Sequence, residues 1–177
     1  MLFTETRLRG AFRIRLERID DDRGFFARTY CEREFTARGL NPRVSQSNIS
    51  FSRRKGTLRG LHYQTAPHAE AKLICCVSGA IYDVIADVRP ESPTFLEWVA
   101  IELRPDACEL LYVPEGFAHG FLALTDDVLV HYQMSECYHP EAARGIRWND
   151  PVLAIEWPTK GSPILSPRDA AWPFLRR

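Results

Sequence analysis

Two histidines with arginine and glycine residues near them are the side chains of this chain best suited to chemistry. His62 lies in the run 59–64 (RGLHYQ), three residues after Arg59, and His119 lies in the run 113–121 (VPEGFAHGF). Histidine titrates near neutral pH, so it can accept a proton and return it. The guanidinium group of arginine binds phosphate or carboxylate through paired hydrogen bonds. Together these residues predict proton transfer on an anionic substrate, although a histidine taken alone is more often a packed, hydrogen-bonded residue.

Metal binding is the main alternative use for these histidines. The segment that ends near His119 resembles the second signature of the cupin superfamily, whose members often bind a metal through an H-x-H pair, a glutamate and a late histidine. Position 64 is Gln64 where that pair has its second histidine, and a metal site needs three or more well-placed protein ligands. His68 and Glu70 lie in a polar, proline-containing segment, where we expect solvated side chains. The sequence therefore predicts no catalytic metal.

Three other side chains can take part in proton chemistry. Lys72 opens the apolar segment 73–77, where an ammonium group can stabilise a developing oxyanion. Tyr132 lies in the strand-like segment 128–134 and is either a half-buried aromatic residue or a general acid. Asp169 is either a first-turn acid favoured by the helix dipole or a carboxylate that orients a histidine.

Composition and charge exclude several classes of protein. The 177 residues correspond to about one domain. Basic and acidic residues number 23 each, so no general positive field indicates a nucleic-acid partner. Five cysteines without a C-x-x-C motif predict reduced thiols and a cytoplasmic location. Residues 1–22 carry charges too often for a secretory signal, and no apolar stretch is long enough to span a membrane.

Short strand-like segments dominate the chain. We expect strands over residues 11–19, 73–77, 81–88, 95–103, 110–113 and 128–134, which are separated by glycine and proline. Short helices are expected over residues 31–38 and near 166–171, where Ser-Pro resembles a helix start. Many short strands with turn signals favour a single β-sandwich or β-barrel domain.

Several motifs in a fixed order carry a resemblance to one family. They are Gln46-x-Asn48-x-Ser50, residues 56–64, Asp83-Val84 with Asp87-x-Arg89, residues 92–94, residues 113–121, residues 145–151 and residues 155–158. In this order they resemble the dTDP-4-dehydrorhamnose 3,5-epimerases, also called dTDP-6-deoxy-D-xylo-4-hexulose 3,5-epimerases, from about residue 10 to the end. The resemblance implies an all-β fold over residues 1–177, a cupin-type jelly-roll β-barrel with short flanking helices. It also implies a homodimer that needs no cofactor and exchanges N-terminal strands between its subunits.

The same resemblance implies roles for individual residues. His62 matches the general base, Asp169 its carboxylate partner, and Tyr132 the proposed general acid. Lys72 matches the lysine that opens the strand after the base and would stabilise the oxyanion. Further substrate-binding residues are expected at Arg23, Phe26, Arg28, Gln46, Asn48, Arg59, His119, Tyr138 and Arg168.

The implied reaction is epimerisation of a nucleotide-linked 4-keto-6-deoxyhexose, whose ketone acidifies the C–H bonds at C3 and C5. Alternatives within this chemistry are inversion of a single centre and a CDP- or GDP-linked substrate. A metal-dependent cupin oxygenase and a non-catalytic sugar-nucleotide binder are alternatives from other classes. Arg28 stands where family members often have a glutamate, which leaves the nucleotide and the sugar open.

Overall fold

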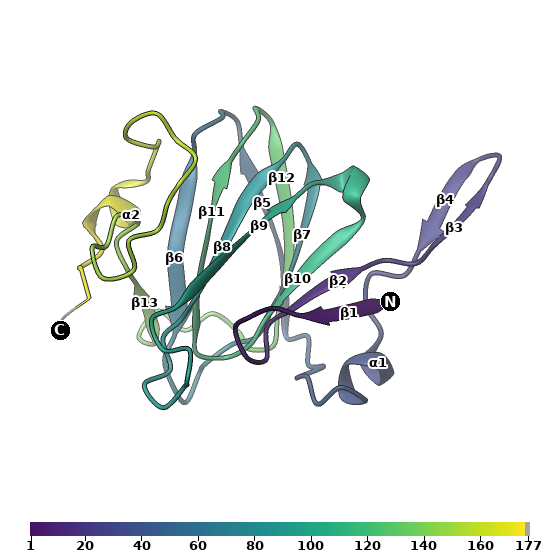
Figure 1. The fold of residues 1–177 in the computed structure, drawn as a ribbon, viewed down its shortest axis with the longest axis horizontal. Coiled ribbons are helices and arrows are strands. Elements are labelled where there is room, and N and C mark those ends of the chain that lie inside the picture. Colours follow the sequence, from purple (N-terminus) through teal and green to yellow (C-terminus); the bar gives the residue numbers. More distant parts are fainter. Residues whose placement is uncertain (176–177) are drawn as a thin grey trace.

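The computed structural model describes residues 1–175, in which two β-sheets face each other (Figure 1). In order across the six-stranded sheet lie β1 (Leu2–Glu5), β2 (Phe12–Arg15), β10 (Glu109–Val113), β7 (Lys72–Ser78), β12 (Val128–Met134) and β5 (Gln46–Ser52). The five-stranded sheet consists of β13 (Ala143–Gly145), β6 (Leu58–Gln64), β11 (Phe117–Ala123), β8 (Ile81–Asp87) and β9 (Trp98–Leu103). A separate hairpin pairs β3 (Arg18–Asp21) with β4 (Gly24–Ala27).

The path of the chain is that of a jelly roll. From β5 onward most successive strands lie in opposite sheets, and every pairing between neighbouring strands is antiparallel. The expected all-β jelly roll is therefore confirmed. Over residues 1–175 the ladders form two separate sheets, so the expected barrel is open rather than closed by hydrogen bonds.

The strands predicted over 73–77, 81–88, 110–113 and 128–134 are confirmed as β7, β8, β10 and β12. The single strand predicted over residues 11–19 is wrong, because the chain changes its pairing partner within that segment. Residues up to Arg15 pair with β1 and β10, whereas those from Arg18 pair only with β4. The alternation of apolar and charged residues runs from Phe12 to Glu17 and breaks at Arg18, where two charged residues are adjacent.

The strand predicted over 95–103 begins later, at Trp98, because a turn is built around Asp87. The carboxylate of Asp87 accepts hydrogen bonds from Arg89 (Nη2, 2.7 Å), Ser92 (Oγ, 2.5 Å) and Thr94 (Oγ1, 2.7 Å). Burial raises the pKa of Asp87, but these bonds outweigh it and lower the pKa to about 2. These motif residues therefore stabilise the turn before β9.

The helices are short and lie outside the sheets (Figure 1). They are α1 (Glu32–Thr36), α2 (Pro167–Ala171) and a 3₁₀ turn at Pro105–Ala107, so both predicted helices are present in slightly shorter form. Helix α2 begins after Ser166, whose Oγ accepts a hydrogen bond from the Asp169 N–H at 3.1 Å. Within residues 1–175, no helix has the length and apolar character needed to cross a membrane.

The main core lies between the two sheets. It includes the fully buried Ile74, Ile85, Leu111 and Val130, which come from β7, β8, β10 and β12. Burying such a side chain contributes about 1.5–3 kcal/mol. The apolar core therefore fixes the sheets that carry the polar residues described below.

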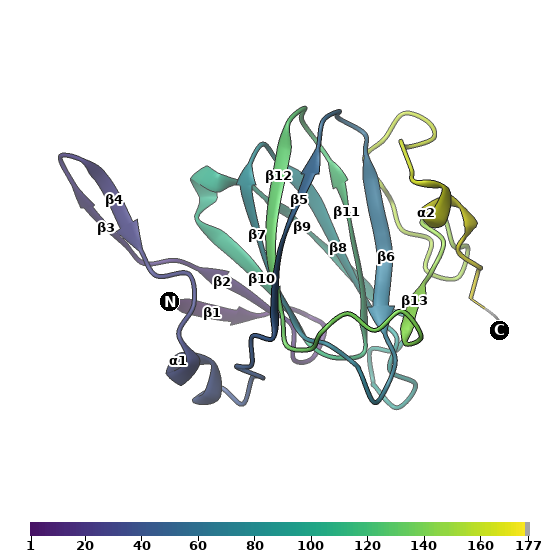
Figure 2. The same cartoon turned by 180° about the vertical axis from the view of Figure 1, so that it is seen from behind.

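The β3–β4 hairpin projects from the body of the molecule (Figures 1 and 2). Its apolar residues Ile19, Phe25 and Phe26 are exposed, with Phe26 at 67%. This is the segment for which strand exchange between subunits is expected, and the homodimer stays a prediction.

Glycines allow two close approaches beside the histidines. Gly60 has a φ of +128°, and an added Cβ would lie 2.4 Å from the Cα of Gly120, so β6 and β11 meet closely. At Gly145, which pairs with His62, an added Cβ would lie 2.2 Å from the Trp172 ring. Gly145 therefore leaves the space in which Trp172 packs against β13.

We expect Gly145→Ala to lower the free energy of unfolding by about 1–3 kcal/mol, because the new methyl group displaces Trp172. Urea unfolding at pH 7 measures this change. The matched control is the same substitution in a Trp172→Ala background, where the clash is absent and the cost should fall below 1 kcal/mol. An equal cost in both backgrounds would show that Trp172 is not the obstacle.

Candidate active site

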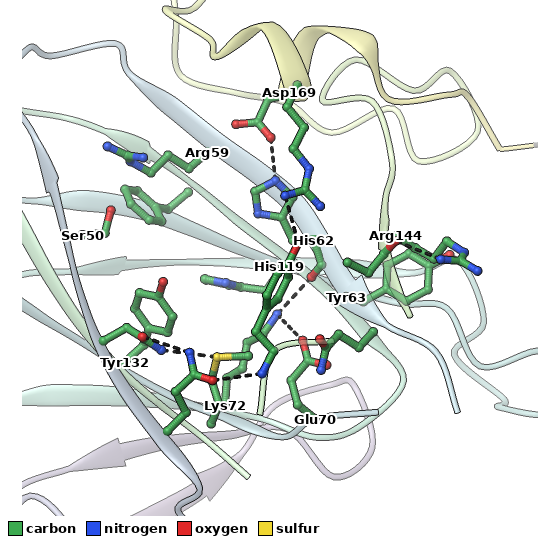
Figure 3. Close-up of a pocket in the computed structure, with 18 of the residues that line it drawn as sticks. Ser50, Arg59, His62, Tyr63, Glu70, Lys72, His119, Tyr132, Arg144 and Asp169 are labelled. Carbon is green, nitrogen blue, oxygen red and sulfur yellow. Dashed lines mark hydrogen bonds and ion pairs between the residues drawn. The ribbon is translucent and has the colours of Figure 1, made fainter. Parts of the chain in front are cut away.

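A pocket of about 400 Å³ lies between the sheets, with helix α2 contributing to its wall (Figure 3). Ten of the expected site residues line it: Gln46, Asn48, Arg59, His62, Lys72, His119, Tyr132, Tyr138, Arg168 and Asp169. The structure thus gathers residues that are spread over more than a hundred positions of the sequence.

Strand pairing explains why these side chains meet. Alternate residues of a strand point to the same face, so Gln46, Asn48 and Ser50 of β5 all line the pocket. Tyr132 of β12 pairs with Asn48, and His62 of β6 pairs with His119 of β11. The six-stranded sheet therefore supplies Tyr132, and the five-stranded sheet supplies both histidines.

His62 is paired with Asp169 of helix α2. The distance between His62 Nε2 and Asp169 Oδ1 is 2.5 Å, and the same oxygen accepts a hydrogen bond from Trp172 Nε1 at 3.3 Å. Asp169 is buried, whereas the His62 side chain is 42% exposed toward the pocket. Burial raises the pKa of Asp169, but the hydrogen bond and charge of His62 and the bonds from Ser166 and Trp172 outweigh it, so the pKa is lowered.

Lys72 is held by a buried carboxylate that the sequence did not reveal. Its Nζ lies 3.0 Å from Glu70 Oε1 and donates a hydrogen bond to the backbone oxygen of His62 at 3.1 Å. The expectation that Glu70 is solvated is wrong, since it is 5% exposed and lines the pocket. The ion pair with Lys72 allows both charges to be buried.

His119 also has a carboxylate partner. Its Nε2 lies 2.6 Å from Oδ1 of Asp83, which is fully buried on β8. One sequence signal could have identified this pair, because Asp83 is a charged residue directly before the apolar run 84–86 of strand β8. Glu70 offered no such signal, since its segment is polar in sequence.

Tyr132 has no side-chain hydrogen bond to residues 1–175. Burial raises the pKa of its phenol, and the nearby Arg59 partly opposes this. The side chain is therefore a neutral hydroxyl group at physiological pH, available to a ligand in the pocket.

Polar residues at the edge of the pocket are connected to one another. Gln46 Oε1 accepts a hydrogen bond from the Tyr138 N–H at 2.9 Å, and Gln46 Nε2 donates to Asn48 Oδ1 at 3.1 Å. Arg168 Nη1 donates to the Tyr138 hydroxyl at 3.2 Å. Arg59 donates to the Phe51 backbone oxygen at 2.7 Å. These bonds hold Arg59 and Arg168 in the wall of the pocket that contains the ionisable residues. Figure 3 shows Arg59 on the same side of the pocket as His62.

Three expected substrate-binding residues do not line this pocket. Arg23 and Phe26 lie on the projecting hairpin, where Arg23 pairs with Asp21. Arg28 lies just after it and contacts Glu34 at 3.5 Å. Within one chain they are separate from the site, and their contribution stays a prediction. The pocket instead includes residues that were not expected there: Ser50, Tyr63, Gln64, Glu70, Phe121, Met134, Ala143, Arg144 and Ser166.

Comparisons with known proteins agree with the resemblance seen in the motifs. Residues 5–177 match the family described as dTDP-4-dehydrorhamnose 3,5-epimerase. A protein of that name from Methanothermobacter thermautotrophicus is 43% identical, over 98% of this chain and 94% of its own. A dTDP-4-dehydrorhamnose 3-epimerase from Streptomyces niveus is 40% identical, over 92% and 78%.

A solved structure shares the fold. The dTDP-6-deoxy-D-glucose-3,5-epimerase of Legionella pneumophila, in complex with dTDP-4-keto-L-rhamnose, is 36% identical to this chain. The superposition covers 98% of this chain and 92% of that chain, with a TM-score of 0.92.

The lowered pKa of Asp169 predicts how its contribution to stability depends on pH. Below about pH 4 the unfolded chain binds a proton at this residue more readily than the folded chain, so the stabilisation is lost as pH falls. We expect Asp169→Asn to cost about 1.5–3 kcal/mol at pH 7, since it removes a charged hydrogen-bond acceptor. Urea unfolding from pH 7 to pH 2.5 should show this difference shrinking below pH 4.

The exposed Glu91 provides the control, and Glu91→Gln should leave stability unchanged at pH 7. A difference for Asp169→Asn that stays constant down to pH 2.5 would contradict the lowered pKa of Asp169.

Proposed function

Because the chain belongs to the dTDP-4-dehydrorhamnose 3,5-epimerase family, we propose that it inverts C3 and C5 of a dTDP-linked 4-keto-6-deoxyhexose. It is thus an isomerase. The observation that carries the proposal is a single pocket with a carboxylate-paired histidine from one sheet and a buried phenol from the facing sheet. Such a pair can remove and return a proton on opposite faces of a sugar ring.

His62 is the proposed base. Its Nε2 is hydrogen-bonded to Asp169, so Nδ1 carries the lone pair that accepts a proton from carbon. Asp169 fixes this tautomer and stabilises the imidazolium that forms. The C–H bond breaks, and its electron pair moves through the new carbon–carbon double bond to the ketone oxygen, which gives an enolate.

Lys72 is the proposed stabiliser of the enolate. Its ammonium group is almost completely buried, at a fixed position between Glu70 and the His62 backbone. A charge held in place in a poorly solvated pocket stabilises a developing oxyanion without having to reorganise. His119, opposite His62 in the ladder and held by Asp83, contacts the sugar in this proposal.

Tyr132 is the proposed acid. It lies on β12 in the sheet that faces β6, and its raised pKa keeps the phenol protonated until it is needed. Proton delivery by Tyr132 to the carbon that His62 deprotonated inverts that centre. Solvent then removes the proton from His62 and returns one to Tyr132, after which the same sequence at the other carbon beside the ketone gives the second inversion.

The nucleotide diphosphate requires cations. Arg59 and Arg168 line the pocket in this chain, and guanidinium groups bind phosphate oxygens through paired hydrogen bonds. We propose that the enzyme is a homodimer in which the β3–β4 hairpin brings Arg23, Phe26 and Arg28 to the pocket of the neighbouring subunit. The exposure of Phe26 in the single chain supports this arrangement.

A panel of dTDP-, CDP- and GDP-linked 4-keto-6-deoxyhexoses in deuterated water tests the function. Double epimerisation places deuterium at both C3 and C5 of the dTDP-linked product, as detected by NMR. Deuterium at C3 alone would assign the single-centre reaction named for the Streptomyces niveus relative.

We expect His62→Ala to reduce kcat by 10²-fold or more, the order of effect expected for the loss of a general base. Steady-state kinetics measure the loss, and thermal unfolding checks that the fold is retained. His131 is the matched control, because it lies on β12, contacts Ser47 and does not line the pocket. Activity of His62→Ala within tenfold of wild type would refute the assignment of the base.

We expect Tyr132→Phe to separate proton removal from inversion. The variant keeps the ring and loses only the acidic proton, so His62 still forms the enolate and returns the proton to the same face. Deuterium exchange beside the ketone should continue while the yield of epimerised sugar falls at least tenfold. The control is Tyr82→Phe, which changes a tyrosine packed on Trp157 outside the pocket. Epimerisation at the wild-type rate would make Tyr132 a packing residue and Tyr138 the next candidate.

We expect chelation of divalent ions to leave turnover unchanged. The groups in the pocket that best bind metals are already paired, His62 with Asp169, His119 with Asp83, and Glu70 with Lys72. Assays before and after exhaustive dialysis against a chelator measure this. Activity that returns only with a particular divalent ion would contradict an acid–base mechanism carried by side chains alone.

A further inference from the structure

Two histidines and a glutamate gather on loops outside the pocket. His68 lies between β6 and β7, and Glu136 and His139 lie between β12 and β13. One ligand atom from each lies within 4.8 Å of the other two. None of the three lines the pocket described above, and the mechanism uses none of them.

Glu141 lies beside this cluster, and its carboxylate determines which nitrogen of His139 is free to bind a ligand. Glu141 Oε1 lies 3.1 Å from His139 Nδ1, whereas His139 Nε2 faces Glu136 Oε1 at 3.9 Å. A proton on Nδ1 donated to Glu141 leaves the lone pair of Nε2 directed toward Glu136. Histidine ligands of metals are commonly held this way by a carboxylate behind the ring.

One buried amide fixes both loops to strand β6. The Nε2 group of Gln64 donates to the backbone oxygens of His68 (2.9 Å) and Cys137 (3.1 Å). Its Oε1 accepts a hydrogen bond from the His139 N–H at 2.6 Å. Gln64 is 4% exposed, so these bonds are protected from water. The backbones of two of the three cluster residues are thus held in place before any ligand binds, which reduces the ordering cost of binding.

The remaining atoms of the cluster are also positioned. Glu136 Oε1 accepts a hydrogen bond from the Cys137 N–H at 2.8 Å, which fixes the carboxylate. The rings of His68 and His139 stack with centroids 3.5 Å apart and planes at 15°. Within residues 1–175 the His68 ring has no hydrogen-bond partner. The rings must turn out of this parallel stack for one nitrogen of each to point at a common ion.

We propose that His68, Glu136 and His139 bind a divalent transition-metal ion of the Zn²⁺ type, with Glu141 holding the ring of His139. Two imidazoles and one carboxylate suit Zn²⁺, with water completing the coordination, whereas Ca²⁺ and Mg²⁺ prefer oxygen ligands. The ion joins two loops at the edge of the pocket, and Tyr138 lies between two of its ligands in sequence. The site therefore stabilises the loop of Tyr138 and takes no part in proton transfer.

The experiment titrates Zn²⁺ into the full-length, metal-free protein by calorimetry, and thermal unfolding is followed in parallel. We expect one equivalent to bind and to raise Tm, because an ion that binds only the folded state stabilises it. His68→Ala and His139→Ala should abolish this binding and the rise in Tm. Glu141→Gln should weaken affinity about 10–100-fold, the effect typical of losing a carboxylate behind a ligand.

Two controls separate the cluster from other zinc-binding groups. His131→Ala removes a histidine outside it, and Cys137→Ser removes the exposed thiol inside the same loop. Both should bind Zn²⁺ as the wild type does. Unchanged binding by His68→Ala and His139→Ala, loss of binding in Cys137→Ser, or equal affinity for Mg²⁺ would each overturn the proposal.

Discussion

The hydrogen bond between His62 and Asp169 joins residues that are 107 positions apart in the sequence. His62 lies on β6, an interior strand of the five-stranded sheet, and Asp169 lies on a helix outside both sheets. Several features serve this contact: the Ser166 cap that starts α2, the space at Gly145, and the Trp172 ring that fills this space and donates to the same carboxylate. The hydrogen bonds from Ser166, Trp172 and His62 also stabilise the charge of Asp169, because a buried carboxylate without partners is strongly destabilising.

Three ionisable side chains that face the pocket are each paired with a buried carboxylate. Asp83 holds His119, Glu70 holds Lys72, and Asp169 holds His62. The partners are buried more deeply than the groups that face the cavity, so each reacting side chain is oriented from behind. Tyr132 is the exception, since its phenol is left without a partner among the described residues. A general acid must be free to donate its proton to the substrate, and an unpaired phenol meets this requirement.

The motifs that resemble the family were sufficient to predict His62, Lys72 and Tyr132, which the structure places at the cavity. The resemblance also predicted Asp169 as the partner of His62, but the sequence did not reveal the partners of Lys72 and His119. Whether Glu70 is buried depends on a loop folding back on the sheet, and whether Asp83 meets His119 depends on the pairing of β8 with β11. Within residues 11–19 the break in alternation after Glu17 marks the division, but local alternation does not show which strands each part pairs with. Long-range pairing is the information that the linear pattern lacks.

The position of Asp169 beyond the last strand, β13, has a consequence for protein synthesis. Translation proceeds from the N-terminus, so both sheets can pair while α2 is still within the ribosome. During that interval His62 lacks its carboxylate and the pocket lacks one wall. A chain that lacks α2 therefore lacks the carboxylate that orients His62, the proposed base, even where both sheets have formed.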